Sequence, residues 1–345
     1  MIFKRSLTVR NQEVGRIRIF AKITLFFCLT LAVCLTVSSC APERPSVSDK
    51  VIRVGLLPID DSLPFFIAEQ EGFFEKRGVS VELVTFNSAS DKEAALEAGA
   101  IDGDMTDIIV AALLTKGDTG IKIVSIALGA DKTEGRFMLL AAPGSSGIST
   151  IEDLRGVPVA VGNNTVIHYI CEKLMFSAGF GEDEIKTQNI PDLGLRLEAL
   201  LGSKIQAAIL PDPLASLAVL QGAGIIADDT RADENLSQSV VLFSRSAIDS
   251  NEDEVQMVMD AYFEAMVFIN ENPDTAAVRN ALFEFCRIPE SMRNLYSTPS
   301  YTPRALPDAL SLADVLEWMV NKGLLDTVIS YNEMVDDRFA NAQYR

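Results

Sequence analysis

Hydrophobic and polar positions follow two alternating periods along residues 51–245. Short apolar or alternating runs predict strands, and amphipathic segments with a 3.6-residue period follow most of them. The predicted strands are Val51–Leu57, Val79–Thr85, Ile101–Met105, Ile121–Ala127, Val157–Val161, Ile185–Ile190, Ile205–Leu210 and Val240–Phe243. Because strands and helices alternate with short connections, the pattern predicts α/β units built on parallel, doubly wound sheets.

Helices are predicted between these strands, several of them ending at a glycine. They cover Leu63–Arg77, Asp91–Ala98, Asp107–Thr115, Asn164–Ala178, Asp192–Leu201 and Pro211–Leu220. Beyond residue 245 the pattern is mostly helical, with long periods over Glu252–Asn270 and Asp308–Lys322. We therefore predict two α/β units, joined by extended crossings near Phe137–Ala142 and Val240–Phe243, with the helical tail returning to the first unit.

The first 39 residues have the pattern of a targeting segment. Six basic residues and one acidic residue precede an uncharged apolar run over residues 23–37. That run of about 15 residues is too short to span a hydrocarbon core of ~30 Å comfortably, as is typical of a signal peptide. An ordinary signal peptide and an uncleaved membrane anchor are the alternatives.

The apolar run ends in Val37-Ser38-Ser39-Cys40, which resembles the bacterial lipobox. This resemblance implies cleavage before Cys40 and lipidation of its thiol, so that residues 1–39 form a lipoprotein signal peptide. Residues 40–50 are rich in proline, serine and charge and predict a tether. Several acyl chains on one cysteine hold a protein stably at a membrane.

Composition excludes several classes of function. The chain of 345 residues is 48% hydrophobic and 23% charged, which is typical of a globular protein. It holds 48 acidic and 30 basic residues, for a formal charge of -18. So acidic a chain repels phosphate backbones, and we predict no nucleic-acid partner. The single histidine excludes a histidine-rich zinc centre.

We predict no catalytic residue, no metal and no cofactor. Of the five cysteines, Cys171 and Cys286 lie in apolar helical stretches, where burial is the expected use. The spacing of the cysteines does not indicate a disulfide framework.

Residues 63–79, LPFFIAEQEGFFEKRGV, carry a family resemblance. They are similar to the P-x-x-x-A-x-x-x-G-F-F-x-x-x-G stretch of nitrate/sulfonate/taurine-type and thiamine-precursor-type substrate-binding proteins of ABC importers. Three weaker blocks follow in order, at residues 98–103, 153–160 and 206–213. The chain departs from the family pattern at Val157, where lysine is usual, and at Gln206, where aspartate is usual. The resemblance covers about residues 51–245.

This resemblance implies an α/β, two-lobed periplasmic-binding-protein fold of type 2, with two hinge crossings. The first lobe would comprise residues 51–138 plus 242–345, and the second residues 139–241. The implied function is that of an extracytoplasmic solute-binding lipoprotein, lipid-anchored to the cell membrane, in the periplasm or at the outer face. As a monomer it would capture a small molecule (a heterocycle, sulfonate, nitrate or similar) between its lobes and deliver it to an ABC permease.

Ligands of open α/β sheets lie beyond the carboxyl ends of the strands, where helix N-termini offer free N–H groups. This rule selects the loops after the predicted strands, and the ligand contacts of the family fall in matching places. The predicted ligand-binding residues are Asp60, Asp61, Ser62, Asn87, Ser88, Ser90, Thr106, Asp107, Asn163, Asn164, Thr165, His168 and Asp212.

Each of these residues also has a purely structural interpretation. Helix capping alone would explain Ser88, Ser90, Asp107 and Asn164. Asp60 and Asp61 also fit a solvated turn, and His168 also fits a structural role.

The selected loops hold four aspartates and no lysine or arginine. This favours a neutral or cationic ligand, such as an amino-substituted heterocycle.

Two other functions remain open. One is a thiamine-pyrimidine-synthase-like enzyme of the same fold, which would use lysine-bound pyridoxal phosphate and a cysteine-rich metal motif; the chain has no cysteine cluster. The other is a ligand-sensing surface lipoprotein, which adjacent permease and ATPase genes would argue against. The chain has no G-x-x-x-x-G-K-[ST] run, so an ATPase would be a separate chain.

Overall fold

The computed structural model describes residues 50–341 apart from 118, 119 and 146. The predicted signal peptide, Cys40 and the tether up to residue 49 lie outside the described residues. Within them, no helix is both long enough and apolar enough to cross a membrane.

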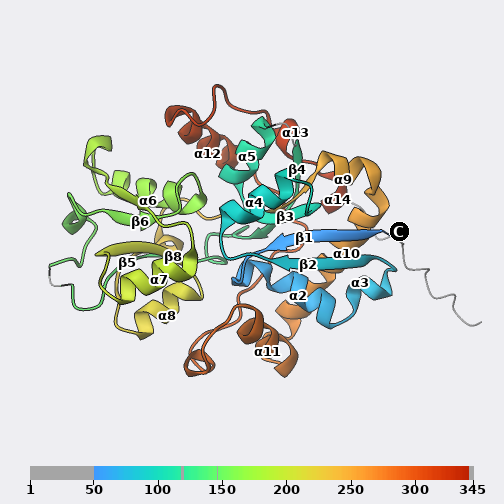
Figure 1. The fold of residues 1–345 in the computed structure, drawn as a ribbon, viewed down its shortest axis with the longest axis horizontal. Coiled ribbons are helices and arrows are strands. Elements are labelled where there is room, and N and C mark those ends of the chain that lie inside the picture. Colours follow the sequence, from blue (N-terminus) through green and yellow to red (C-terminus); the bar gives the residue numbers. More distant parts are fainter. Residues whose placement is uncertain (1–49, 118–119, 146, 342–345) are drawn as a thin grey trace, which may run out of the picture. The chain divides into compact units, whose positions relative to one another are not determined.

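Two five-stranded sheets organise the described chain (Figure 1). The first has the strand order β2-β1-β3-β10-β4. Its strands are β1 (Val51–Leu56), β2 (Ser80–Thr85), β3 (Gly103–Asp107), β4 (Ile121–Leu128) and β10 (Ser239–Ser244). The first three pair in parallel, whereas β10 runs antiparallel to both β3 and β4. The amino end of β10 therefore lies at the same edge of the sheet as the carboxyl ends of β1 and β3.

The second sheet repeats this arrangement, with the order β7-β6-β8-β5-β9. Its strands are β5 (Phe137–Ala141), β6 (Val159–Val161), β7 (Thr187–Asn189), β8 (Ala207–Pro211) and β9 (Gly224–Asp228). Here β6 is parallel to β7 and β8, and β5 is antiparallel to β8 and β9. The two-lobed α/β class predicted from the sequence is confirmed.

The chain passes between the sheets at places other than those predicted. The segments predicted as crossings are strands: β5 belongs to the second sheet and β10 to the first. The connections are residues 129–136 and 229–238, which precede β5 and β10. Apolar runs suit both a buried strand and an extended connection, and pattern alone does not separate them. The predicted lobe boundaries at 138/139 and 241/242 fall inside these strands.

Two groups of helices flank the first sheet (Figure 1). One comprises α2 (Leu63–Gln70), α3 (Phe73–Lys76), α10 (Glu252–Glu271) and α11 (Ala276–Phe285). The other comprises α4 (Ala89–Glu97), α5 (Ile108–Lys116), α12 (Ala309–Asn321) and α13 (Tyr331–Met334). Two short helices, α9 (Arg245–Ser250) and α14 (Arg338–Asn341), lie beside α10. The single helix predicted over residues 63–77 is broken at Gly72, whose φ of 69° is left-handed.

The second lobe is smaller. Its helices are α6 (Val166–Ser177), α7 (Leu193–Leu201) and α8 (Leu214–Leu220). Figure 1 shows α6 on one side of the sheet and α7 and α8 on the other. Five 3₁₀ turns complete the described elements: η1 (Asp60–Ser62), η2 (Glu152–Leu154), η3 (Glu182–Glu184), η4 (Asp229–Arg231) and η5 (Glu290–Met292).

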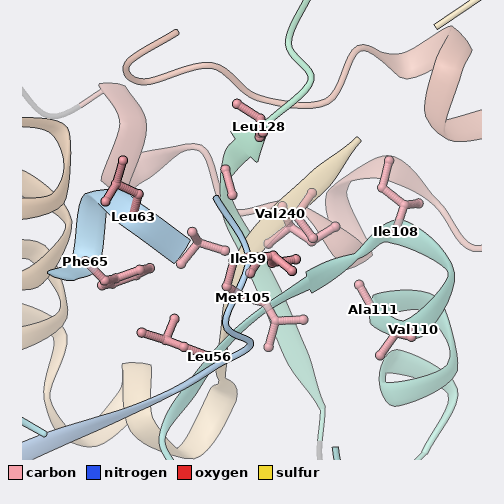
Figure 2. Packing of buried hydrophobic residues seen from close by; sticks show 14 of the residues in the cluster. Leu56, Ile59, Leu63, Phe65, Met105, Ile108, Val110, Ala111, Leu128 and Val240 are labelled. Carbon is pink, nitrogen blue, oxygen red and sulfur yellow. The ribbon is translucent and has the colours of Figure 1, made fainter. Parts of the chain in front are cut away.

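An apolar core holds the strand ends of the first lobe in place. Figure 2 shows side chains from strands, helices and the loop after β1 packed together, among them Leu56, Ile59, Leu63, Phe65, Met105 and Val240. Phe65 also packs on Tyr262 of α10, with ring centroids 4.4 Å apart. Each fully buried side chain of this size contributes ~1.5–3 kcal/mol to the free energy of folding. This packing holds the strand ends, from which the loops of the first lobe begin, in fixed positions.

Both described cysteines, Cys171 and Cys286, are free and buried, as predicted. Burial raises the pKa of Cys171 to about 12. The thiol therefore stays protonated and unreactive near neutral pH.

Candidate functional site

A cavity of about 240 Å³ lies between the two lobes. Its walls come from the loops after β1 and β6, from the end of β3, from the first turns of α4, α6 and α7, and from the starts of β5 and β10. Apolar side chains form much of the lining, among them Leu57, Met105, Phe137, Ile167 and Leu193. An apolar cavity with a few polar groups, placed at strand ends between two lobes, has the character of a small-molecule site.

Seven of the predicted ligand-binding residues line this cavity. They are Asp61, Ser90, Thr106, Asp107, Asn163, Asn164 and Thr165. They belong to both lobes, so the strand-end rule brings together residues that lie about a hundred positions apart in the sequence.

Asp107 accepts hydrogen bonds from both lobes. It is the N-cap of α5, where its Oδ1 accepts hydrogen bonds from Ile109 N at 2.9 Å and Val110 N at 3.0 Å. Its Oδ2 accepts from Val166 N at 3.0 Å, at the start of α6 in the other lobe. Burial raises the pKa of Asp107, although these backbone hydrogen bonds lower it. The capping interpretation of Asp107 is confirmed, and the same carboxylate also joins the lobes.

The loop 162–165 presents backbone and side-chain groups from the second lobe. Asn164 has a left-handed φ of 59°, and its N–H donates to His168 Nδ1 at 3.4 Å. Thr165 Oγ1 donates to Gly162 O at 2.7 Å and closes the loop. Asparagine tolerates the left-handed conformation better than most side chains. Asn164 is not the N-cap of α6, which is Thr165.

The other six predicted residues do not line the cavity. Asn87 is exposed, and its Oδ1 accepts from Arg287 at 3.3 Å. Ser88 is buried and caps α4 by accepting from Asp91 N at 3.2 Å, which confirms its capping interpretation. Ser62 is buried, and its hydroxyl has no partner within the described chain.

Asp60 and Asp212 are bound by the surrounding protein. Asp60 accepts a 2.5 Å hydrogen bond from Tyr296, and burial raises its pKa well above the usual value, with neighbouring Asp61 adding to the rise. The solvated turn considered for Asp60 and Asp61 is wrong, because both side chains are buried. Asp212 is held by Arg136 at 2.5 Å and accepts from Ser216 N.

His168 belongs to a cluster that joins α6 to α12. Its Nε2 lies 3.2 Å from Glu172 Oε1, and its ring meets that of Trp318 edge to face. Glu172 also accepts from Trp318 Nε1 at 2.9 Å and Lys322 Nζ at 2.8 Å. These contacts fit the structural interpretation of His168.

Sequence reasoning missed four polar residues of the lining: Glu93, Arg196, Gln238 and Ser239. Glu93 lies inside α4, about one turn beyond the predicted residue Ser90, and Arg196 lies inside α7, which follows a loop that holds no predicted residue. Gln238 and Ser239 begin the returning segment. A strand that runs antiparallel starts at the edge where its parallel neighbours end, and the hydrophobic pattern does not give the direction of a strand.

The missed residues change the electrostatic character of the site. The carboxylates of the lining are Asp61, Glu93 and Asp107, and its cation is Arg196. Arg196 is 1% exposed and donates to the carbonyl oxygens of Ile190 and Ile209, while burial lowers its pKa to about 10. The absence of lysine and arginine predicted for the loops therefore does not extend to the whole cavity.

A buried ion pair lies next to the cavity. Lys92 on α4 and Asp104 on β3 form it, and both side chains are wholly buried. Burial raises the pKa of Asp104 to about 6, although Lys92 lowers it. Within the described chain, no group of three or more His, Cys, Asp or Glu residues is placed to hold a metal ion.

Comparison with known proteins identifies the family. The sequence matches the profile of the NMT1-like family over residues 46–282. The chain belongs to the NMT1-like family. This assignment and the structures below support the resemblance to nitrate- and sulfonate-type binding proteins seen in the sequence.

A curated relative is similar over a shorter stretch. The nitrate import ATP-binding protein NrtC of Synechococcus elongatus (strain ATCC 33912 / PCC 7942 / FACHB-805) is 30% identical over 107 residues. Those residues are 30% of this chain and 16% of NrtC, so the match spans about a sixth of that relative.

Solved structures show the fold. The periplasmic aliphatic sulphonate-binding protein SsuA of Escherichia coli has a TM-score of 0.67 at 20% identity, covering 84% of this chain and 92% of SsuA. The periplasmic nitrate-binding protein NrtA of Synechocystis PCC 6803 has a TM-score of 0.70 at 15% identity, covering 87% and 88%. The desulfurization enzyme DszB has a TM-score of 0.62 at 15% identity, covering 85% and 98%. The fold is thus the two-lobed one of periplasmic binding proteins, and an enzyme also uses it.

Proposed function

We propose that this chain is an extracytoplasmic solute-binding protein, which encloses a small molecule between its lobes and delivers it to the permease of an ABC importer. The observation that carries this proposal is the cavity itself, which residues of both lobes line. Membership of the NMT1-like family supports it, as do the sulphonate- and nitrate-binding proteins that share the fold.

The architecture suits capture by closure. Among the described residues, two connections, residues 129–136 and 229–238, carry the chain between the sheets, and a hinge needs only a few residues whose backbone angles change. A ligand that contacts both walls stabilises the closed form by its differential affinity for it. The Asp107–Val166 hydrogen bond shows that the two walls lie within direct contact.

Binding without catalysis is part of the proposal. No lysine, histidine or cysteine of the described chain lines the cavity, so an imine or thiolate intermediate has no residue on which to form there. The buried Lys92 is paired with Asp104. Incubation with pyridoxal phosphate should therefore give no imine absorbance; an imine band that a Lys92→Met variant lacks would favour the enzyme alternative.

Attachment to the membrane through Cys40 is also part of the proposal, and the charge pattern and lipobox resemblance of residues 1–40 support it. Cys40→Ser should abolish palmitate labelling of the chain. Cys34→Ser, in the apolar run, is the matched control and should keep the label. Unchanged labelling of Cys40→Ser would contradict the lipid anchor while leaving the solute-binding role untouched.

A thermal-shift screen of small metabolites tests capture directly. The full chain would be purified in a non-ionic detergent, as a monomer under this proposal. A genuine ligand raises the melting temperature in proportion to the logarithm of its concentration. Asn163→Ala removes a side chain of the cavity wall and should weaken the hit, whereas Asn321→Ala, exposed at the end of α12, should not. A screen without a stabilising compound, or a hit that both variants retain, would contradict the proposed site.

A further inference from the structure

Side chains of the protein occupy the helix N-termini that border the cavity. The starts of α4, α5, α6 and α7 lie there, and each has at least one backbone N–H group bound to a side chain. Ser88 accepts at α4, Asp107 at both α5 and α6, and Asp192 at α7. Free N–H groups at such positions form the usual anion site of an open α/β sheet. Here, oxygen atoms of the protein already fill part of that site.

The loop into α6 is filled most completely. Its N-cap residue, Thr165, makes no capping hydrogen bond with its own side chain. Three N–H groups of this loop and the first turn are instead bound to other side chains. They belong to Asn163, Asn164 and Val166, and their acceptors are Asn189 Oδ1 at 3.0 Å, His168 Nδ1 at 3.4 Å and Asp107 Oδ2 at 3.0 Å. Among these acceptors, Asp107 is the one that carries a carboxylate and comes from the other lobe.

The carboxylate of Asp107 lies where the acidic group of a ligand would bind. Its Oδ1 accepts from the first turn of α5 and its Oδ2 from the first turn of α6, so both oxygens are engaged. An anion that binds at either helix must displace this carboxylate or lie beside it. Displacement breaks hydrogen bonds that the protein already has, and a place beside it brings two negative charges together.

Arg196 does not leave an open anion position in the second lobe. Its Nε and Nη2 donate to Ile190 O at 2.9 and 2.6 Å, and its Nη1 donates to Ile209 O at 3.1 Å. The residue is almost wholly buried, and Asp192 stabilises its positive charge from the start of the same helix. Every nitrogen of the guanidinium therefore already has an acceptor in the protein.

We propose that Asp107 is a specificity-determining residue, whose carboxylate fills the anion position between α5 and α6 and restricts the cavity to solutes without a negative charge. This inference rests on the proposed solute-binding function and narrows the chemical class of the solute. The solute would be a small molecule without an acidic group, with an apolar body that lies against Leu57, Met105 and Phe137. This class differs from the nitrate and sulphonate named for two proteins that share the fold.

Three probes separate charge from shape. Benzoate and benzamide carry the same apolar ring and differ in charge, and nitrate is an anion about the size of a carboxylate group. Each is titrated by calorimetry into the full chain, in non-ionic detergent and a buffer without chloride. The parent should bind benzamide at least about tenfold more tightly than benzoate, as for an unfavourable contact with one charged group, and should not bind nitrate.

Asp107→Ser tests the role of the carboxylate. Serine is as good an N-cap as aspartate, so α5 keeps its cap, while the negative charge is removed and the N–H group of Val166 becomes free. This variant should gain nitrate binding and bind benzoate at least about tenfold more tightly than the parent does. Asp308→Ser makes the same change at the N-cap of α12, outside the cavity, and should keep the preference of the parent. Asp107→Asn removes the charge at nearly constant size and should also gain affinity for benzoate; it serves as the test if Asp107→Ser does not fold.

Several results would overturn the inference. One is a parent that binds nitrate, or that binds benzamide no more tightly than benzoate. Another is a lack of gain in affinity for either anion in both Asp107→Ser and Asp107→Asn. If the thermal-shift screen yields only anionic ligands of the cavity, the inference is wrong and the solute-binding function stands. If the screen yields no ligand at all, both fall.

Discussion

Val166 N donates a 3.0 Å hydrogen bond to Asp107 Oδ2, across the cavity from the second lobe to the first. The other oxygen of the same carboxylate caps α5. One buried side chain therefore satisfies N–H groups at the starts of two helices, where the helix dipoles favour a negative charge. This arrangement makes the stability of α5 and the contact between the lobes depend on one residue.

Asp107→Ala should reduce both stability and contact between the lobes. Loss of the cap on α5 should cost ~1–2 kcal/mol in the free energy of unfolding, measured by urea denaturation. Loss of the second acceptor should leave Val166 N–H unprotected. Hydrogen-exchange mass spectrometry should therefore show faster exchange in the peptide that contains Val166.

Asp308→Ala provides the matched control. Asp308 caps α12 with the same pair of hydrogen bonds, to Leu310 N and Ser311 N at 3.0 Å, and takes no part in the cavity. It should cost comparable stability without changing exchange at Val166. Equal exchange at Val166 in the two variants would show that the Asp107 contact does not hold the lobes together.

The Lys92–Asp104 pair should behave as a buried ion pair. Lys92→Met leaves Asp104 uncompensated in an apolar setting, which should cost ~3–5 kcal/mol in the free energy of unfolding. Adding Asp104→Asn should recover most of that loss, because no unpaired charge is left. Arg53→Met is the control: its partner is Glu82 at 3.1 Å, both side chains are about half exposed, and the loss should be below ~1 kcal/mol. A small loss in Lys92→Met would contradict the buried pair.

The sequence predicted those parts of the site that depend on local pattern. Asp107 and Asn163 were found because each follows a recognisable parallel strand, and such strands end at the ligand-binding edge. Gln238 was missed because the rule considers where strands end, whereas β10 is antiparallel and begins at that edge. Recognising β10 as a returning strand places it in the first sheet but does not by itself give its direction.

The sequence could not separate the predicted residues that line the cavity from those that do not. Asp60, His168 and Asp212 stand at or near strand ends, yet Tyr296, Trp318 and Arg136 bind them. Those partners lie between 76 and 236 positions away in the sequence. Tertiary contacts over such distances leave no local pattern, so the sequence could not tell an aspartate of the cavity wall from one bound by the surrounding protein.

Glu172 should make the contact between α6 and α12 sensitive to acid. Burial alone would raise the pKa of Glu172, but hydrogen bonds from His168, Lys322 and Trp318 lower it to about 2, from an ordinary value of 4.5. A lowered pKa means that the ionised carboxylate stabilises the fold above pH 4.5, and that this contribution is lost as the pH falls toward 2. The contribution of the ionised Glu172 to the free energy of unfolding is ~1–3 kcal/mol.

The fluorescence of Trp318, the single tryptophan of the chain, measures this effect. Its emission should shift toward that of a solvated indole between pH 4.5 and 2, and Glu172→Gln should lower the free energy of unfolding at pH 7. Glu182→Gln removes a weaker, largely exposed partner of the same Lys322 and should change little. A parent-like stability in Glu172→Gln would contradict the role of the cluster.

The contribution of Glu93 to stability should have the opposite pH dependence to that of Glu172, because Glu93 is largely buried and forms no ion pair with a described residue. Burial raises its pKa from 4.5 to about 7, although Lys92 lowers it. The carboxyl group of Glu93 therefore binds its proton more tightly in the folded protein than in the unfolded chain. The stability that this protonated group contributes is fully present below pH 4.5 and is lost as the pH rises through 7. Glu93→Gln removes the ionisable group and should be more stable than the parent at pH 8, by ~1–3 kcal/mol.

Urea denaturation at pH 4, 6 and 8 tests this prediction, because the difference between Glu93→Gln and the parent should grow across the series. Glu97→Gln makes the same chemical change at an exposed position of α4 and should show no such trend. Binding sites commonly carry groups that cost the empty protein stability and are satisfied only by the ligand. A Glu93→Gln variant less stable than the parent at pH 8 would mean that the ionised carboxylate stabilises the fold.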